Sequence, residues 1–169
     1  MKRTVLTILL VALLAPSALA ALKINDAAPA FSLPGAGQRN FSFGAGPGAQ
    51  SSEKGKAYVL SFFATWCPAC REELPILDSL VDELSARGIT VVLIGVREDF
   101  EEIGDLLNEL KVKKPLVLND QKGTVAEKYQ VRFLPTTFFI GSDGKVKDII
   151  FGGIDDRAEL KKSSEKLLK

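Results

Sequence analysis

Residues 58–74 read YVLSFFATWCPACREEL, and this stretch decides the fold class of the chain. It opens with an apolar run at residues 58–63, which is typical of a strand buried on both faces. Apolar residues then recur at helical spacing, and Gly88 closes the pattern as glycine commonly ends a helix. These residues are Leu74, Leu77, Leu80, Val81 and Leu84. The stretch therefore predicts a buried strand that leads into a long amphipathic helix.

Strand and helix patterns alternate along the rest of the chain. Further strands are expected at residues 28–33, 41–43, 89–96, 115–118, 136–140 and 146–151, the last two joined by an Asp-Gly turn. Further helices are expected at residues 100–110, with Asp99 as N-cap, at 123–129, and from Asp155 or Asp156 to Leu168. Residues 44–55 are rich in Gly, Ser and Ala, which predicts a surface loop. The order predicts one α/β domain with a central mixed sheet flanked by helices.

Composition narrows the chemistry that the chain can perform. Its 169 residues carry a formal charge of +1, so the charge indicates neither a nucleic acid nor an anionic membrane as a partner. The chain has no histidine and only two cysteines. A structural zinc site needs about four Cys or His ligands, and a secreted disulfide scaffold needs more cysteines at wider spacing. We therefore expect no metal and no cofactor.

Residues 1–20 have the organisation of a cleavable export signal. Two basic residues near the start precede an apolar stretch at residues 5–14, and an Ala-Leu-Ala cleavage site ends at Ala20. The apolar stretch is shorter than the ~20 residues needed to span a bilayer, although an uncleaved anchor is the alternative. We expect a mature domain at residues 21–169, located outside the cytoplasm and, more specifically, in the periplasm, where disulfide chemistry persists.

The two cysteines lie three positions apart, where the buried strand meets the long helix. Cys67 falls at the expected exposed start of the helix, where unpaired N–H groups and the helix dipole favour a thiolate. It is therefore the expected nucleophile, and Cys70, one turn further on, the more buried resolving thiol. Pro68 suits the first helical turn because its missing N–H would have no partner there. The alternative is a merely structural cysteine pair.

Several segments of the chain resemble one family. Residues 60–75 are similar to the active-site segment of extracytoplasmic thioredoxin-like proteins, and most similar to the TlpA/ResA group of the redoxin (AhpC/TSA-related) superfamily. The resemblance extends over nearly all of the mature chain, through residues 28–33, 129–131, 134–138 and 143–146. It implies a thioredoxin-like fold with an N-terminal β-hairpin extension. It also implies a thiol–disulfide oxidoreductase that works as a disulfide reductase, in several members during cytochrome c maturation.

The resemblance also implies residues that contact the substrate. Pro135 should follow a cis peptide bond and lie beside the cysteine pair, leaving the backbone of Leu134 free to meet an extended substrate strand. Pro68 between the cysteines and Trp66 before them complete this expected surface. Trp66 is expected to cover the disulfide, with a plain core aromatic as the alternative. For Pro135 the alternative is an ordinary proline at a strand start.

Glu73 matches a glutamate that the TlpA/ResA group carries near its cysteines. The match implies that Glu73 either tunes the thiols or takes the proton of Cys70, and the alternative is a first-turn glutamate that complements the helix dipole. Ser61 stands where cytoplasmic thioredoxins carry a buried aspartate, which leaves Glu73 as the nearest candidate base. Phe133 stands where many relatives have glycine, and its ring is expected to restrict the substrates admitted.

The expected partners follow from the same resemblance. They are protein thiols and disulfides, with apocytochrome c as the first candidate client, and a membrane electron donor; the protein is expected to be a monomer. A peroxiredoxin-like peroxidase is one alternative, although Ala64 and Leu60 stand where that family carries threonine and proline. A redox-inert binding protein of the same fold is another. Pro68 and Ala69 leave the direction of electron flow open, and a reduction potential would decide it.

Overall fold

The computed structural model describes residues 21–37, 40–44 and 56–168. The expected export signal at residues 1–20 and nearly all of the expected loop at 44–55 lie outside the described residues. None of the described helices combines the length and the apolar character needed to cross a membrane.

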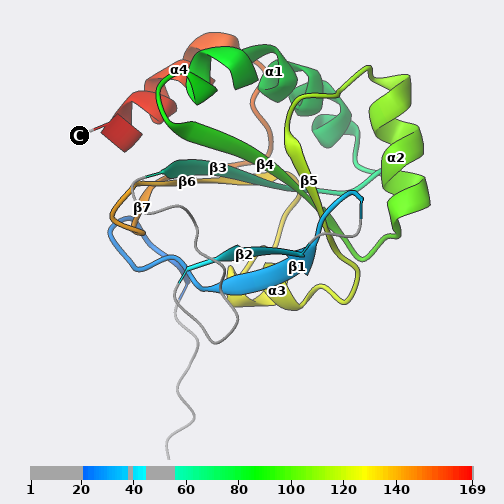
Figure 1. Ribbon diagram of the computed structural model, residues 1–169, viewed down its shortest axis with the longest axis horizontal. Coiled ribbons are helices and arrows are strands. Elements are labelled where there is room, and N and C mark those ends of the chain that lie inside the picture. Colours follow the sequence, from blue (N-terminus) through cyan, green and yellow to red (C-terminus); the bar gives the residue numbers. More distant parts are fainter. Residues whose placement is uncertain (1–20, 38–39, 45–55, 169) are drawn as a thin grey trace, which may run out of the picture.

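A five-stranded mixed sheet forms the centre of the domain (Figure 1). Its strands are β3 (Ala57–Phe63), β4 (Ile89–Val96), β5 (Leu116–Asp120), β6 (Thr136–Ile140) and β7 (Val146–Phe151), in the spatial order β5-β4-β3-β6-β7. The β3–β4 and β4–β5 pairs are parallel, whereas β3–β6 and β6–β7 are antiparallel. The mixed sheet predicted from the sequence is therefore confirmed, with β3 at its centre.

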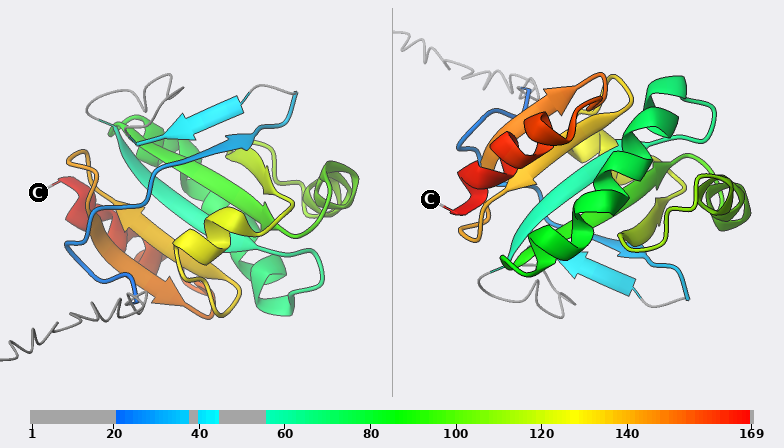
Figure 2. Two further views of the ribbon diagram at one scale, coloured as in Figure 1. Left: turned by 90° about the horizontal axis from the view of Figure 1, so that it is seen from below. Right: turned by 90° about the horizontal axis from the view of Figure 1, so that it is seen from above.

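Helices and a hairpin cover the two faces of the sheet (Figure 2). One face carries α1 (Pro68–Ser85), α4 (Arg157–Glu165) and the short 3-10 helix η1 (Lys166–Leu168). The opposite face carries α3 (Thr124–Lys128) and the antiparallel hairpin of β1 (Phe31–Pro34) and β2 (Asn40–Phe43). Helix α2 (Phe100–Glu109) lies beside β5 at the edge of the sheet. The expected N-terminal hairpin and flanking helices are both present.

Strand β3 is buried along its whole length because it contributes to two cores. Ala57, Val59 and Phe63 pack with the leucines of α1, while Tyr58, Leu60 and Phe62 pack with the hairpin and α3. Successive side chains of a strand point to opposite faces, so the apolar run at 58–63 was required by both layers. By the same alternation Ser61 faces α1, the helix whose first turn carries the cysteine pair.

Several element boundaries differ from the sequence prediction. The first strand begins at Phe31 instead of residue 28, because Ala27 and Ala28 bond to the β6–β7 turn and Pro29 has no N–H to donate. Strand β5 extends two residues beyond the predicted end, to Asp120. The last predicted helix divides into α4 and η1, and Asp156 is its N-cap.

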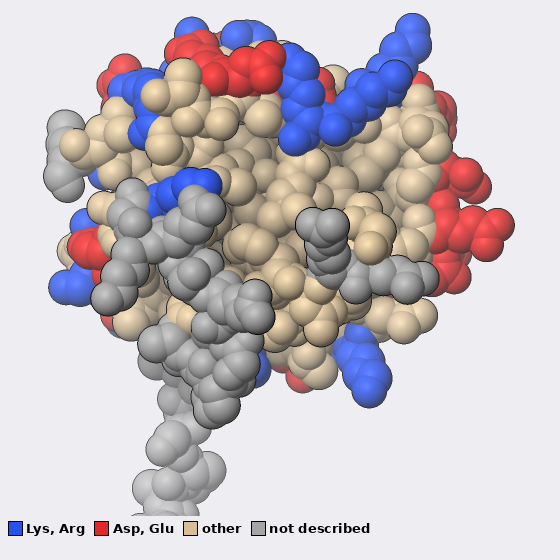
Figure 3. Space-filling view, viewed as in Figure 1, with Lys and Arg blue, Asp and Glu red and all other residues tan. Residues whose placement is uncertain are grey.

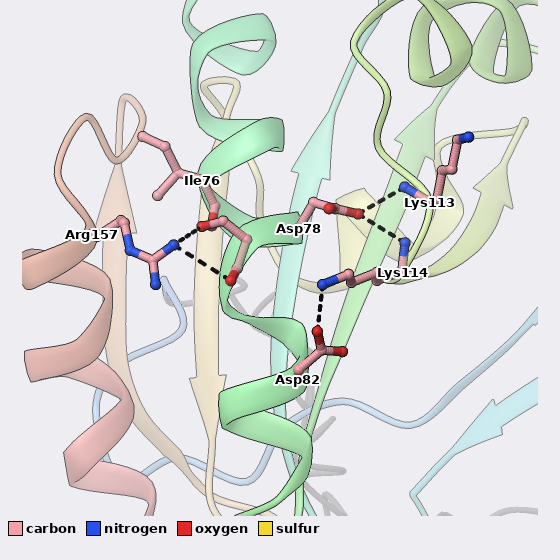
Figure 4. Close-up of polar contacts among 7 residues, drawn as sticks. Ile76, Asp78, Asp82, Lys113, Lys114 and Arg157 are labelled. Carbon is pink, nitrogen blue, oxygen red and sulfur yellow. Dashed lines mark hydrogen bonds and ion pairs between the residues drawn. The ribbon is translucent and has the colours of Figure 1, made fainter.

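Polar contacts hold α1 from both sides (Figure 4). The Asp78 carboxylate accepts the backbone N–H groups of Lys113 (2.7 Å) and Lys114 (2.8 Å), which precede β5. On the other side, the Arg157 guanidinium of α4 donates to the carbonyl and hydroxyl oxygens of Ser79. Exposed contacts of this kind contribute little individually. They nevertheless fix the axial position of the helix whose first turn carries the cysteine pair.

The face seen in Figure 3 carries charges of both signs around its rim. Acidic side chains gather at the right edge, over the region of α2, whereas acidic and basic side chains are mixed along the top. The centre of this face consists of uncharged residues. The charge on this view therefore forms no continuous basic field of the kind that attracts a phosphate backbone.

Candidate active site

The cysteine pair occupies the first turn of α1. Cys67 is the N-cap residue, with extended backbone angles, and Pro68 is the first residue of the helix. Cys67 and Cys70 are joined by a disulfide, with Cα atoms 5.3 Å apart. The backbone N–H of Cys70 donates to Sγ of Cys67 at 3.2 Å. The sulfur of Cys67 therefore takes the position that a capping oxygen usually fills, and it meets the positive end of the helix dipole.

Both sulfurs are shielded from solvent in this disulfide form. Cys70 is fully buried and only 4% of Cys67 is exposed. The sequence prediction of an exposed Cys67 is therefore wrong for the oxidised state, although Cys67 remains the more accessible of the two. The reason is that the pair joins the apolar core between α1 and the sheet. Trp66 is 73% exposed, so the alternative that it is a core aromatic is also wrong.

The proline loop lies against the cysteine turn. The peptide bond between Leu134 and Pro135 is cis, the geometry that the family resemblance implies. Gly153, which follows β7 with a φ of +100°, lies between the two: a Cβ at this position would be 3.5 Å from both the Ala69 side chain and the Pro135 ring. These distances are ordinary van der Waals contacts, so it is the positive φ that favours glycine at this position. Sequence analysis did not single out Gly153, and the Gly-Gly pair after the last strand was the available signal.

Glu73 is buried beneath this turn and holds three hydrogen bonds. Only 1% of the residue is exposed, and it lies in the second turn of α1, so the first-turn dipole alternative is wrong. Its Oε1 accepts the hydroxyls of Ser61 (2.8 Å) and Thr137 (2.7 Å). Its Oε2 accepts the backbone N–H of Ile154 at 3.0 Å. Ser61, which stands at the position of the thioredoxin aspartate, and Glu73 of α1 therefore belong to one hydrogen-bond network.

This network can accommodate both protonation states of Glu73. Burial raises the pKa of the Glu73 carboxyl, and the hydrogen bonds from Thr137, Ser61 and Ile154 offset part of that rise. The N–H of Ile154 requires an acceptor in either state, whereas the hydroxyls of Ser61 and Thr137 can rotate to donate or to accept. A proton on Oε1 therefore finds a partner without movement of the backbone. Such a group is suited to storing and releasing a proton close to the cysteines.

A hollow of about 310 Å³ opens on the other side of the cysteine turn. Trp66 and Leu134 line it, together with Val131 and the ion pair between Arg97 and Glu127, whose charged atoms are 3.1 Å apart. Two of the residues that the sequence predicts to bind substrate therefore meet in one concave surface. Phe133 is 67% exposed and lines a separate hollow with Phe151. Phe133 is therefore not among the residues that line the hollow of Trp66 and Leu134.

Comparison with known proteins identifies this arrangement. The family model described as the AhpC/TSA family matches residues 24–149, which is most of the chain. The chain belongs to the AhpC/TSA family. Among curated proteins it is 30% identical to the thiol-disulfide oxidoreductase ResA of Oceanobacillus iheyensis over 138 residues, covering 81% of this chain and 70% of that protein. It is also 32% identical to the thiol-disulfide oxidoreductase ResA of Bacillus subtilis over 102 residues, which cover 60% of this chain and 56% of that protein.

Solved structures agree with this membership. A Chlorobium tepidum protein, described as a candidate thiol:disulfide interchange protein DsbE, has a TM-score of 0.76 and 27% identity, covering 88% of this chain and all of its own. The AhpC/TSA member described here is therefore a thiol–disulfide oxidoreductase of thioredoxin-like fold, as the sequence resemblance implies.

Proposed function

We propose that this oxidoreductase is a disulfide reductase that acts outside the cytoplasm, with Cys67 as the attacking sulfur and Cys70 as the resolving one. One observation carries the assignment: Sγ of Cys67 caps α1 and accepts the N–H of Cys70. When the pair is reduced, the same N–H and the helix dipole stabilise a thiolate at Cys67. Cys70 is fully buried, so a client disulfide can reach only Cys67.

The reaction transfers two electrons in two exchanges. The Cys67 thiolate attacks one sulfur of the client disulfide, forming a mixed disulfide and releasing one client thiolate. The Cys70 thiolate then attacks Sγ of Cys67, which releases the second client thiolate and closes the Cys67–Cys70 disulfide. A membrane electron donor would return two electrons to the pair. Glu73 would accept the proton that Cys70 must lose, because it lies one helical turn from Cys70 on the same face.

The client would bind across the cysteine turn and the proline loop. An extended client strand can pair with the backbone of Leu134, while Trp66, Pro68 and Pro135 supply the apolar contacts. The position of Trp66 supports this, because the residue is 73% exposed and lines one hollow together with Leu134, where a client can reach both. Apocytochrome c is the first client to test, by analogy with the TlpA/ResA group. The reduction potential of the purified protein would establish the direction of transfer, since ~30 mV already corresponds to ~1.4 kcal/mol.

We expect the exported protein to begin at or near Ala21. The basic start, the short apolar stretch and the Ala-Leu-Ala site favour cleavage after Ala20. Intact-mass measurement of the protein recovered from outside the cytoplasm should give the mass of residues 21–169. A full-length chain retained in the membrane fraction would instead establish an uncleaved anchor. The same sample, run by analytical ultracentrifugation, should sediment as a monomer.

In the reduced protein, Cys67 should be alkylated about tenfold faster than Cys70 at neutral pH, because its thiolate is stabilised at the helix start and its neighbour is buried. Brief treatment with iodoacetamide followed by peptide mapping measures the ratio. Denatured protein serves as the control, and there both thiols should react equally. Preferential labelling of Cys70 in the folded protein would reverse the two roles.

The structure argues against the peroxidase alternative. At the position of the peroxiredoxin threonine, Ala64 is buried and has no hydroxyl, and its carbonyl accepts the N–H of Cys67 at 3.2 Å. Leu60, in place of the motif proline, lies within β3 and pairs with β4 and β6. No side chain at these two positions can donate a hydrogen bond to a peroxide. A peroxide-consumption assay alongside insulin reduction would separate the two activities.

A further inference from the structure

Both carboxylate oxygens of Glu98 bind Thr65, the residue that precedes Trp66 and Cys67. Both of its oxygens accept the backbone N–H of Thr65 at 2.9 Å, and Oε1 also accepts the Thr65 hydroxyl. Only 7% of Glu98 is exposed. Among the described residues, no lysine or arginine forms an ion pair with it. A largely buried carboxylate whose hydrogen bonds, among the described residues, all go to one threonine requires an explanation.

The capping of α2 does not provide that explanation. The N-cap of α2 is Asp99, which accepts the N–H groups of Glu101 and Glu102 and receives the reciprocal bond from Glu102. Glu98 precedes this capping box and takes no part in it. The dipole of α2 reduces the cost of the charge, but it does not direct the carboxylate toward Thr65.

The topology shows how Glu98 reaches the active-site loop. Strands β3 and β4 are adjacent and parallel, so the loops that follow them lie at the same edge of the sheet. After β4, Arg97 adopts a left-handed conformation with a φ of +60°, and its N–H bonds to the carbonyl of Asp120 at 3.1 Å. This conformation is uncommon for a residue with a side chain. It turns the chain so that Glu98 meets the loop after β3.

The contact limits the freedom of the residues that lead into Cys67. The loop from Ala64 to Cys67 is closed at one point by the bond from the Cys67 N–H to the Ala64 carbonyl. Glu98 holds the intervening Thr65 by its backbone and its hydroxyl. Trp66, which follows Thr65, is largely exposed. The Glu98 carboxylate, in the segment that follows β4, therefore holds the loop between Ala64 and Cys67.

We propose that Glu98 is a positioning residue for the Cys67 sulfur: through Thr65 it holds the loop that places Trp66 and Cys67 at the start of α1. The inference rests on the proposed role of Cys67 as the attacking sulfur. Glu98 acts by hydrogen bonding, so its charge is dispensable. A glutamine can keep this contact after a small rotation of its side chain: its one oxygen accepts the Thr65 N–H, and its NH₂ group turns from that N–H to donate to the Thr65 hydroxyl.

The test measures how fast the Cys67 thiol reacts with 5,5′-dithiobis(2-nitrobenzoic acid). It uses a Cys70→Ser background, so that Cys67 is the one thiol that can react. Glu98→Ala should slow this reaction by about ten- to a hundredfold, the range expected when a reacting group is misplaced. It should also lower the fluorescence anisotropy of Trp66, the single tryptophan of the chain. Glu98→Gln should restore both readouts to within about twofold of the parent. The matched control is Glu83→Gln, an ion-pair residue near the far end of α1.

An unchanged rate in Glu98→Ala would overturn the proposal, as would a slower rate with unchanged Trp66 anisotropy. A glutamine variant as slow as the alanine variant would also overturn the proposal, because the charge of Glu98 and not its hydrogen bonding would then matter. If Glu98→Ala does not fold, the test compares Thr65→Val with Thr65→Ser. The valine variant should slow the reaction of the Cys67 thiol, and the serine variant should not. Equal reaction rates in these two variants would overturn the proposal. Failure of the proposed function appears differently, as an absence of mixed disulfides with protein clients while the dependence on Glu98 persists.

Discussion

Cys70→Ser should convert this oxidoreductase into a trap for its clients. In the proposed mechanism, exchange passes through a mixed disulfide between Cys67 and the client, and Cys70 of the wild type attacks that bond from within the same helical turn. The effective concentration of an intramolecular nucleophile can reach ~10⁵ M or more, far above that of any external thiol. Serine leaves Cys67 able to attack but removes the group that releases the client. Turnover should therefore fall by several orders of magnitude while covalent complexes accumulate.

The measurement is capture of the tagged variant under non-reducing conditions, followed by mass spectrometry of the bound proteins. Cys67→Ser is the matched control and should capture nothing, because the Cys70 that remains is fully buried. Apocytochromes among the captured proteins would support the proposed client class. Equal capture by the two variants, or capture by neither, would contradict the assignment of Cys67 as attacker and Cys70 as resolver.

Glu73→Gln should slow the resolving step strongly while leaving the fold intact. The amide can turn its oxygen toward the N–H of Ile154 and donate from its NH₂ group to the Ser61 and Thr137 hydroxyls, which are able to accept. It cannot, however, take the proton of Cys70. Loss of a positioned base typically costs ~10²-fold or more, so the rate at neutral pH should fall by about that factor. Stopped-flow measurement of mixed-disulfide resolution across pH gives the profile, which should lose the inflection that belongs to Glu73.

The same variant should change how stability depends on pH. Because burial raises the pKa of Glu73 in the folded protein, the folded state binds this proton more tightly than the unfolded chain does. The contribution of this group to the free energy of unfolding is complete below its unfolded pKa and is lost as the pH rises through the folded one. Glutamine has no such proton, so urea unfolding of Glu73→Gln should show a smaller decline over that interval. An unchanged rate profile together with an unchanged stability profile would remove Glu73 from the proton transfer.

The sequence by itself determined the layout of the domain and the reacting pair. The two-sided burial of β3 requires an apolar run, the face of α1 requires leucines at helical spacing, and both features are local patterns. The predicted limits of β4, β6 and β7 match the structure for the same reason. The position of Cys67 at the start of α1 also follows from local order, since a strand and a helix meet there. Such features depend on neighbours within a few residues along the chain.

Only the tertiary structure decided which distant groups meet around that pair. Ser61, Thr137 and Ile154 come from three separate segments, and they converge on Glu73 because the β3–β6 pairing and the loop after β7 bring them under α1. Gly153 reaches Ala69 and Pro135, and Glu98 reaches Thr65, through the same packing. The physical reason is that hydrogen bonding and close packing depend on distance in space, whereas periodicity records only separation along the chain. The burial of Cys67 in the oxidised state likewise follows from the layers packed around it, which no local pattern specifies.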